Sequence, residues 1–109
     1  MTIDWVSGLY EGEGTLVKDK RRQASWTLRV CMTDLDVLER FKEFVGYGTI
    51  SEDNSPSRLS NSRRKVSWTY IVTKRSIIKK LLTQMLPYLG NRRAHRALDC
   101  LDDFDNLLN

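Results

Sequence analysis

The chain has 109 residues, of which 40% are apolar, so we expect residues 1–109 to form a single domain with a modest core. Its 18 basic and 14 acidic residues give a net charge of +4, which favours a polyanionic partner. No stretch is long and apolar enough to span a membrane, and the N-terminus lacks the pattern of a secretory signal. We therefore expect an intracellular protein with no membrane partner.

Residues 2–11 are predicted to form a short N-terminal helix. Trp5 and Leu9 recur at helical spacing and provide its apolar side. Gly12 and Gly14 are expected to end the helix, because glycine readily adopts the backbone angles that terminate helices.

Apolar residues then alternate with polar ones, which indicates a β-strand over residues 25–33. Residues 15–19 are its expected hairpin partner, and the connection between the two strands is basic. Because the period is two, one face of the second strand should be buried. The residues of that face are Trp26, Leu28, Val30 and Met32.

A threonine with an acid three residues later, Thr33 and Asp36, predicts a capping box at the start of a second helix. Gly46 should end this helix, and a second pair of strands should follow over residues 48–52 and 65–73. A polar segment joins these two strands. The apolar residues of the helix are Leu35, Leu38, Phe41 and Val45.

Two more helices are expected to close the chain. The first should end at Pro87, and the second should follow Asn91. This order of helix, two strands, helix, two strands and two helices predicts an α+β fold with helices on one side of an antiparallel sheet. The apolar residues of the last two helices are Ile77, Ile78, Leu81, Leu82, Met85, Ala94, Ala97, Leu98, Leu101 and Leu108.

The other face of that sheet should be polar and weakly basic, with many hydroxyl side chains. Such side chains can hydrogen-bond to phosphates and base edges, but antiparallel sheets also commonly expose an ordinary solvent-facing side. Spacing alone does not decide between these two interpretations. The two cysteines, Cys31 and Cys100, have no metal-ligand spacing and are expected to be small, buried, reduced side chains.

The end of the first helix contains the residues with the clearest chemistry. Ser7, Gly8 and Gly12 are small and helically spaced, so one face of the helix could let a second helix backbone approach closely. Glu11 and Glu13 follow at the C-terminal end, where the helix dipole disfavours acids. A hard divalent cation such as Mg²⁺ would relieve this conflict, because carboxylate and carbonyl oxygens are its preferred ligands.

Residues 5–16, Trp-Val-Ser-Gly-Leu-Tyr-Glu-Gly-Glu-Gly-Thr-Leu, resemble the signature of the LAGLIDADG homing endonucleases. The match consists of three identities, one conservative replacement of an alanine, and two acids at the acidic positions. These are Gly8, Leu9 and Gly14, then Ser7, and then Glu11 and Glu13.

The resemblance continues over nearly the whole chain, through residues 32–34 and 46–48 and through residues 86–89 with Arg92 and Arg93 after them. It implies the family's αββαββα(α) fold. In that fold an antiparallel, saddle-shaped sheet binds DNA and the helices pack on the opposite face.

The resemblance also implies a role for each residue of the motif. Glu13 matches the acid that binds the catalytic metal, Mg²⁺ or Mn²⁺, and the Gly12 carbonyl matches a second metal ligand. Glu11 matches the other acidic position, where it would brace the helix end. Only one copy of the motif is present, so a homodimer is implied, with Ser7, Gly8, Glu11 and Gly12 at the interface.

Two further catalytic residues are implied by the resemblance. Arg92 stands where family members often carry a lysine that supports the transition state. Arginine keeps the positive charge but cannot exchange a proton, so an acid–base role at this position is in doubt. Asp34 would orient a water molecule, unless it serves only as the cap of the second helix.

The implied activity is that of a site-specific DNA endonuclease in intron homing. Such an enzyme cuts both strands of a palindromic or near-palindromic double-stranded site and leaves short 3′ overhangs. The alternatives are a binding-only DNA regulator and an RNA maturase on the same fold, although so short a chain leaves little surface for an RNA partner. The residues expected to bind DNA are Thr15, Val17, Asp19, Arg21, Ser25, Thr27, Arg29, Ser51, Arg63, Arg64, Lys65, Ser67, Thr69 and Ile71.

Overall fold

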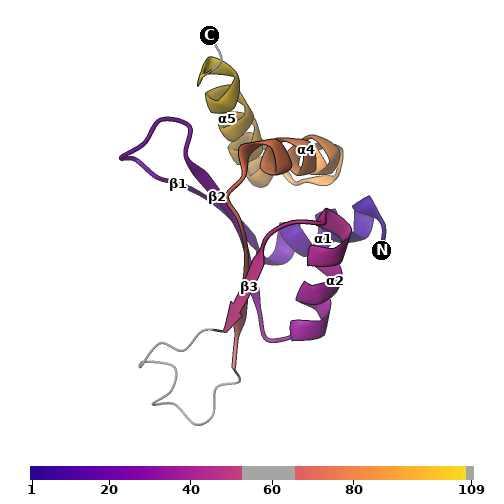
Figure 1. Ribbon diagram of the computed structural model, residues 1–109. Helices are drawn as coiled ribbons and strands as arrows, with labels where there is room; N and C mark the ends of the chain where they lie inside the picture. The colour runs from indigo at the N-terminus through magenta and orange to yellow at the C-terminus, as the bar shows by residue number, and fades with distance from the viewer. Residues whose placement is uncertain (53–65, 108–109) are drawn as a thin grey trace.

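The computed structural model describes residues 1–52 and 66–107, which form helices on one side of an antiparallel sheet (Figure 1). The order of elements is the predicted one, apart from a short 3₁₀ helix, η1, before the last helix. In chain order the elements are α1 (Ile3–Glu13), β1 (Gly14–Lys18), β2 (Trp26–Met32), α2 (Leu35–Val45), β3 (Thr49–Glu52), β4 (Trp68–Val72), α4 (Arg75–Met85), η1 (Leu86–Tyr88) and α5 (Asn91–Leu107).

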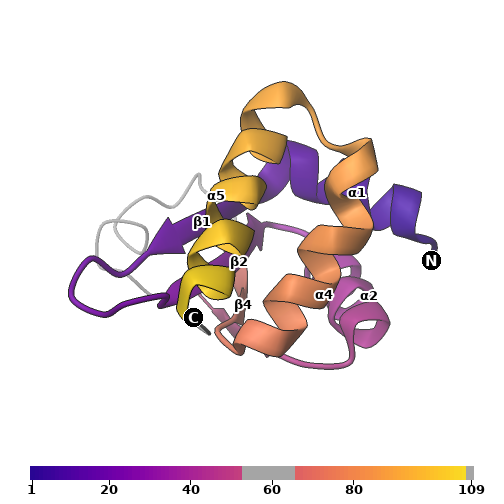
Figure 2. The ribbon, with the colours of Figure 1, turned by 90° about the horizontal axis from the view of Figure 1, so that it is seen from above.

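The four described strands lie in the order β1-β2-β4-β3, and all three neighbouring pairs are antiparallel. Figure 1 shows the sheet close to edge-on, with the described α-helices on one side and no described element on the other. In the view from above, α4 runs beside α5 (Figure 2), and α4 contacts both α1 and α5. The predicted α+β class and one-sided layering are therefore confirmed.

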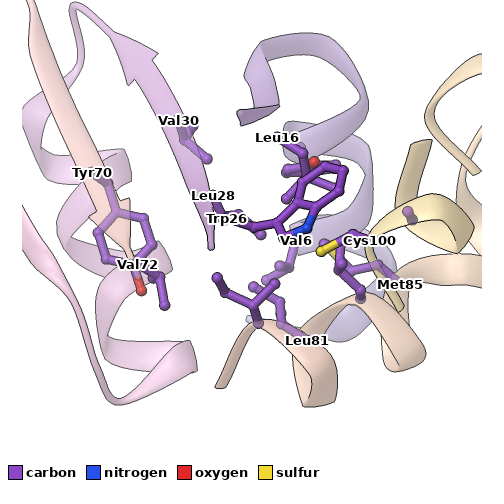
Figure 3. Close-up of a cluster of buried hydrophobic side chains, with 14 of the residues drawn as sticks. Val6, Leu16, Trp26, Leu28, Val30, Tyr70, Val72, Leu81, Met85 and Cys100 are labelled. Atoms are coloured by element: carbon purple, nitrogen blue, oxygen red, sulfur yellow. The ribbon is translucent and has the colours of Figure 1, made fainter. Parts of the chain in front are cut away.

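The core lies between the sheet and the helices. Trp26, Leu28 and Val30 of β2 are buried on the face that their alternation predicts. Figure 3 shows Trp26 beside Cys100 of α5, with Met85 of α4 close by. Because burial of apolar surface is the dominant favourable term in folding, this cluster decides which face of the sheet the helices cover.

The first helix is longer than expected, because α1 continues through Gly12 to Glu13. The residue that ends it is Gly14, which is extended and donates its N–H to the carbonyl of Tyr10. A glycine inside a helix costs only about 1 kcal/mol relative to alanine. The burial of Val6 and Tyr10 on the core side of α1 outweighs that cost.

The predicted capping box of the second helix is wrong. The helix begins at Leu35, and its N-cap is Asp34, whose side chain makes no hydrogen bond to the first turn. Because β2 extends to Met32, Thr33 belongs to the connection and lies one residue too early to cap the helix. The end of α2 is as predicted, since Gly46 has a φ of 78°, in the left-handed region that favours glycine.

Three smaller details also differ from expectation. β4 begins at Trp68, later than predicted. Cys31 is exposed because it lies on the outward side of β2, whereas Cys100 is buried as predicted. Leu98 is 51% exposed, because α5 turns its neighbour Ala97 into the core instead.

Among the described helices, none has the length and apolar character that crossing a membrane requires.

Candidate functional site

The uncovered face of the sheet is hollowed into a groove with a cavity volume of about 440 Å³. Antiparallel pairing brings residues of this face opposite one another, so that Thr15 lies opposite Arg29 and Arg29 lies opposite Ile71. The groove is lined by Glu13 from the end of α1 and by six of the residues expected to bind DNA. These six are Thr15, Val17, Arg29, Ser51, Thr69 and Ile71.

Two residues that were not predicted to bind DNA, Cys31 and Glu52, also line the groove. Cys31 lies two residues beyond Arg29 on β2, so the strand period alone places it on this face. Glu52 is the last residue of β3, where alternation no longer determines the direction of a side chain. Among the described lining residues, the acids Glu13 and Glu52 outnumber the cation Arg29, so the expected weakly basic character is wrong for this part of the face.

Glu13 is the last residue of α1, and its exposed side chain lines the groove. The helix leads directly into β1 at Gly14, where a Cβ would lie 2.1 Å from Cδ2 of the buried Tyr10. Because no loop separates α1 from β1, this joint between the two elements holds Glu13 directly beside the first strand. No basic residue occupies the last turn of α1, so the helix dipole adds to the negative charge of the carboxylates here.

Arg93 of α5 contacts this end of α1, a role that the sequence did not predict. Its Nε donates to the Glu11 carbonyl at 2.5 Å, and its Nη1 donates to the Gly14 carbonyl. The Glu11 carboxylate lies 3.7 Å from the same Nε. It also faces Gly90, where a Cβ would come within 2.6 Å of Oε1. The side chain of Glu11 is thus held within its own chain, in agreement with a bracing role at the helix end.

The small residues of α1 lie on two different faces. Ser7 is fully buried, and its Oγ donates to the Ile3 carbonyl at 2.7 Å. The assignment of the Ser7 side chain to a dimer interface is therefore wrong, because the helix turns it into the core. Gly8 and Gly12 are exposed, and a Cβ at either position would meet no atom within 4 Å. Together with Trp5, which is 42% exposed, they form an open helix face.

Arg92 and Asp34 do not share the groove with Glu13. Arg92 is exposed in the first turn of α5 and lines a second cavity of about 380 Å³, which Thr15 also lines. His95 lines the same cavity and is exposed. Asp34 is exposed at the start of α2 and lines neither cavity. The catalytic roles of Arg92 and Asp34 stay predictions, and the single chain does not bring them together with Glu13.

The other expected DNA-binding residues fall into four groups. Thr27 is half-buried on β2, and Asp19, Arg21 and Ser25 lie in the β1–β2 connection. A hydrogen bond from the Arg21 backbone N–H holds the pKa of Asp19 below its ordinary value. Ser67 is buried, precedes β4 and does not line the groove, so its role in DNA binding stays a prediction. Outside the described residues lie Arg63, Arg64 and Lys65.

The donors at the end of α1 suit a hard divalent cation, because the Glu13 carboxylate and the Gly12 carbonyl are both oxygen ligands. Gly12 is exposed and leaves room for a close approach to its backbone. Within residues 1–52 and 66–107, however, no group of three or more His, Cys, Asp or Glu side chains is placed to hold a metal ion.

No family model matches the sequence, and no curated protein matches it. Solved structures do match. The homing endonuclease I-CvuI, in complex with its target in the presence of Ca, superposes with a TM-score of 0.68 at 17% identity. The match covers 92% of this chain and 63% of that one, so this chain spans less than two thirds of the length of I-CvuI.

Two other homing endonucleases have similar structures. I-TnaI has a TM-score of 0.65 at 18% identity, with 92% of this chain and 69% of that chain covered. The meganuclease I-SmaMI, bound to uncleaveable DNA, has a TM-score of 0.67 at 18% identity, with 93% of this chain and 35% of that chain covered. These similarities show that the chain has the fold of the LAGLIDADG homing endonucleases, as its motif implied.

Proposed function

We propose that this chain is a site-specific DNA endonuclease that acts as a homodimer with Mg²⁺ or Mn²⁺. It would cut both strands of a palindromic or near-palindromic site and leave short 3′ overhangs. The observation that carries this proposal is that Glu13 lines the same groove as six polar and apolar residues of the open sheet face. A metal-binding carboxylate in that position would meet the backbone of a duplex lying along the sheet.

The groove has the chemistry needed to read a duplex. Thr15, Ser51 and Thr69 present hydroxyl groups and Arg29 presents a guanidinium group, all of which can hydrogen-bond to phosphates or base edges. Val17 is 41% exposed and can contact a thymine methyl group. A twisted antiparallel sheet can enter a DNA groove with its open face, since strands serve as readers in other DNA-binding proteins.

A second copy of the chain would supply a second Glu13 carboxylate and a second Gly12 carbonyl. The described part of one chain offers the Glu13 carboxylate and the Gly12 carbonyl at the end of α1, while the Glu11 carboxylate is held against Arg93 and Gly90. If two α1 helices pack along the open face of Trp5, Gly8 and Gly12, two such ends meet near a twofold axis. Each Glu13 would then act on one DNA strand, which agrees with a palindromic target.

The chain's own groups have separate tasks in this proposal. The Glu13 carboxylate and Gly12 carbonyl would hold the metal ion, which when bound would polarise the scissile phosphate and activate water. The groove residues would hold the duplex and fix its register. Arg92, which lines a cavity with Thr15, would place a permanent positive charge near the phosphate backbone without exchanging a proton.

The test begins with the selection of a cleaved site from a random DNA library in the presence of Mg²⁺. Cleavage of that site is then compared for the wild type, Glu13→Gln and Glu39→Gln. Glu39 is an exposed acid on α2, on the helix side of the sheet, and serves as the matched control. We expect Glu13→Gln to lower the rate by about 100-fold or more, because the metal contributes several kcal/mol to the transition state.

Site-specific DNA binding should survive in Glu13→Gln, and Glu39→Gln should cleave like the wild type. Cleavage that persists in Glu13→Gln would overturn the assignment of this residue. A wild-type protein that binds a specific site but cleaves nothing with Mg²⁺ or Mn²⁺ would favour the binding-only regulator. Preferential binding of structured RNA would favour the maturase.

A further inference from the structure

Arg93 bridges two backbone carbonyls that lie on either side of Gly12 and Glu13. Its Nε donates to the carbonyl of Glu11 at 2.5 Å, and its Nη1 donates to the carbonyl of Gly14. The side chain is only 19% exposed, so these hydrogen bonds are largely protected from water. One guanidinium group therefore spans the two residues that we assign to the metal.

The end of a helix is where such a bridge has the most effect. The last four carbonyls of a helix have no partner within it, and they carry the negative end of the helix dipole. In α1, the carbonyl of Tyr10 accepts from the N–H of Gly14, and the carbonyl of Glu11 accepts from Arg93, which also donates to the carbonyl of Gly14 at the start of β1. These bonds do not use the carbonyl of Gly12, which we assign as a metal ligand.

The surroundings of Arg93 hold its guanidinium group in this position. Its Cζ lies 5.8 Å from the centre of the buried Tyr10 ring, over the face of the ring. The Glu11 carboxylate balances its charge, with Oε2 3.7 Å from Nε, a distance too long for a hydrogen bond. Oε2 is buried and has no hydrogen-bond partner among the described residues. The guanidinium group therefore donates its hydrogen bonds to the two backbone carbonyls and not to the Glu11 carboxylate.

We propose that Arg93 is a positioning residue for the metal-binding end of α1. It fixes the backbone at Glu11 and Gly14, and thereby sets the direction in which the Gly12 carbonyl and the Glu13 carboxylate project. This inference rests on the proposed function of Glu13. It adds that the geometry of the site is set by α5, which lies almost at the other end of the chain.

The main test variant is Arg93→Lys, which keeps the charge but replaces a planar fork with a single ammonium group. Arg93→Gln removes the charge as well. The matched control for that loss is Lys80→Gln, because Lys80 is an exposed cation on α4 that lines a cavity with Phe44 and Val45 of α2. Three properties are measured for each variant: amide hydrogen exchange without metal, the Mg²⁺ concentration needed for half-maximal cleavage, and the affinity for the selected DNA site in Ca²⁺.

We expect the Gly14 amide to exchange about 10-fold faster in Arg93→Lys than in the wild type, because that amide closes the last turn of α1. Cleavage at saturating DNA should fall about 10- to 100-fold and require more Mg²⁺, as for other residues that orient metal ligands. DNA affinity should stay within about 3-fold of the wild type, because Arg93 does not line the groove. Lys80→Gln should match the wild type in all three measurements.

An Arg93→Lys protein with wild-type exchange at Gly14 and a wild-type Mg²⁺ requirement would overturn the inference. A uniform loss of DNA affinity with an unchanged Mg²⁺ requirement would also overturn it, since Arg93 would then be a DNA contact. The exchange measurement needs neither metal nor cleavage. If the wild type proves not to cleave, the proposed function fails, while the effect of Arg93 on the end of α1 is still measured.

Discussion

Removal of the Asp103 carboxylate should destabilise the protein far more than removal of the Asp105 carboxylate two residues later on α5. Asp103 accepts a 2.8 Å hydrogen bond from the indole Nε1 of Trp26, a residue that is only 3% exposed, and lies 3.3 Å from Nζ of Lys18. Asp105 lies 3.5 Å from Nζ of Lys79, but these two side chains are 60% and 52% exposed. The two acids therefore differ in environment although they share a helix.

The expected magnitudes follow from these surroundings. Asp103→Ala leaves the indole N–H of Trp26 buried without its acceptor, which costs about 1–3 kcal/mol. Loss of the half-exposed ion pair with Lys18 adds about 1 kcal/mol at most. Asp105→Ala breaks only an exposed pair, so the free energy of unfolding should change by about 0.5 kcal/mol or less.

The difference in the free energy of unfolding between the wild type and Asp103→Ala should also depend on pH. The hydrogen bond from Trp26, followed by the contacts with Lys18, holds the pKa of Asp103 below its ordinary value of 3.8. A carboxyl group with a lower pKa in the folded state stabilises the fold above its unfolded pKa, and this stabilisation is lost as the pH falls through the folded pKa. The gap between wild type and Asp103→Ala should therefore be full above about pH 5 and narrow steadily at lower pH.

Urea unfolding followed by circular dichroism measures these differences, with every variant at one protein concentration because a dimer's stability depends on concentration. Equal losses in Asp103→Ala and Asp105→Ala would refute the reasoning about the buried indole. A gap that stays constant as the pH falls would refute the role of the ionised carboxylate.

Two further predictions concern the glycines of α1 and its joint with β1. Gly8→Leu should leave each chain folded, because a Cβ there meets nothing within 4 Å, but the protein should sediment as a monomer; a Gly8→Leu dimer would contradict the proposed packing of two α1 helices. Gly14→Ala should lower the free energy of unfolding by about 1–3 kcal/mol, because its Cβ would lie 2.1 Å from Cδ2 of Tyr10. Gly12→Ala, whose Cβ would meet no atom of its own chain, should cost no more than about 1 kcal/mol when both alanine variants are compared in the monomeric Gly8→Leu background; equal losses there would contradict the geometry of the joint.

The parts of the fold that follow from short-range patterns could be predicted from the sequence. The alternation of Trp26, Leu28 and Val30 identified both β2 and its buried face, because successive side chains of a strand point to opposite sides. Gly46 ended its helix as expected, because its left-handed backbone conformation suits glycine. The motif around Glu13 pointed to the fold that the solved structures share with this chain.

Predictions failed where two local signals competed. Gly12 looked like a helix end, but the helix continues to Glu13, since the burial of Val6 and Tyr10 outweighs the small cost of one glycine. Ser7 looked like part of an exposed stripe of small residues. Its burial was decided by the angle at which α1 packs, which the spacing of small residues does not contain.

The sequence by itself determined the motif, the order of the elements and the face of each strand that is buried. These depend on residues within a few positions of one another, whose spacing sets which side they share. Only the tertiary structure decided that Glu13 lines the groove of the open sheet face, apart from Arg92, and that Arg93 holds the carbonyls beside it. Arg93 and Glu11 are 82 residues apart, and no local period relates them. Their contact exists because the fold brings the first turn of α5 to the end of α1, where the guanidinium group of Arg93 reaches a helix carbonyl without a partner in the helix and the first carbonyl of β1.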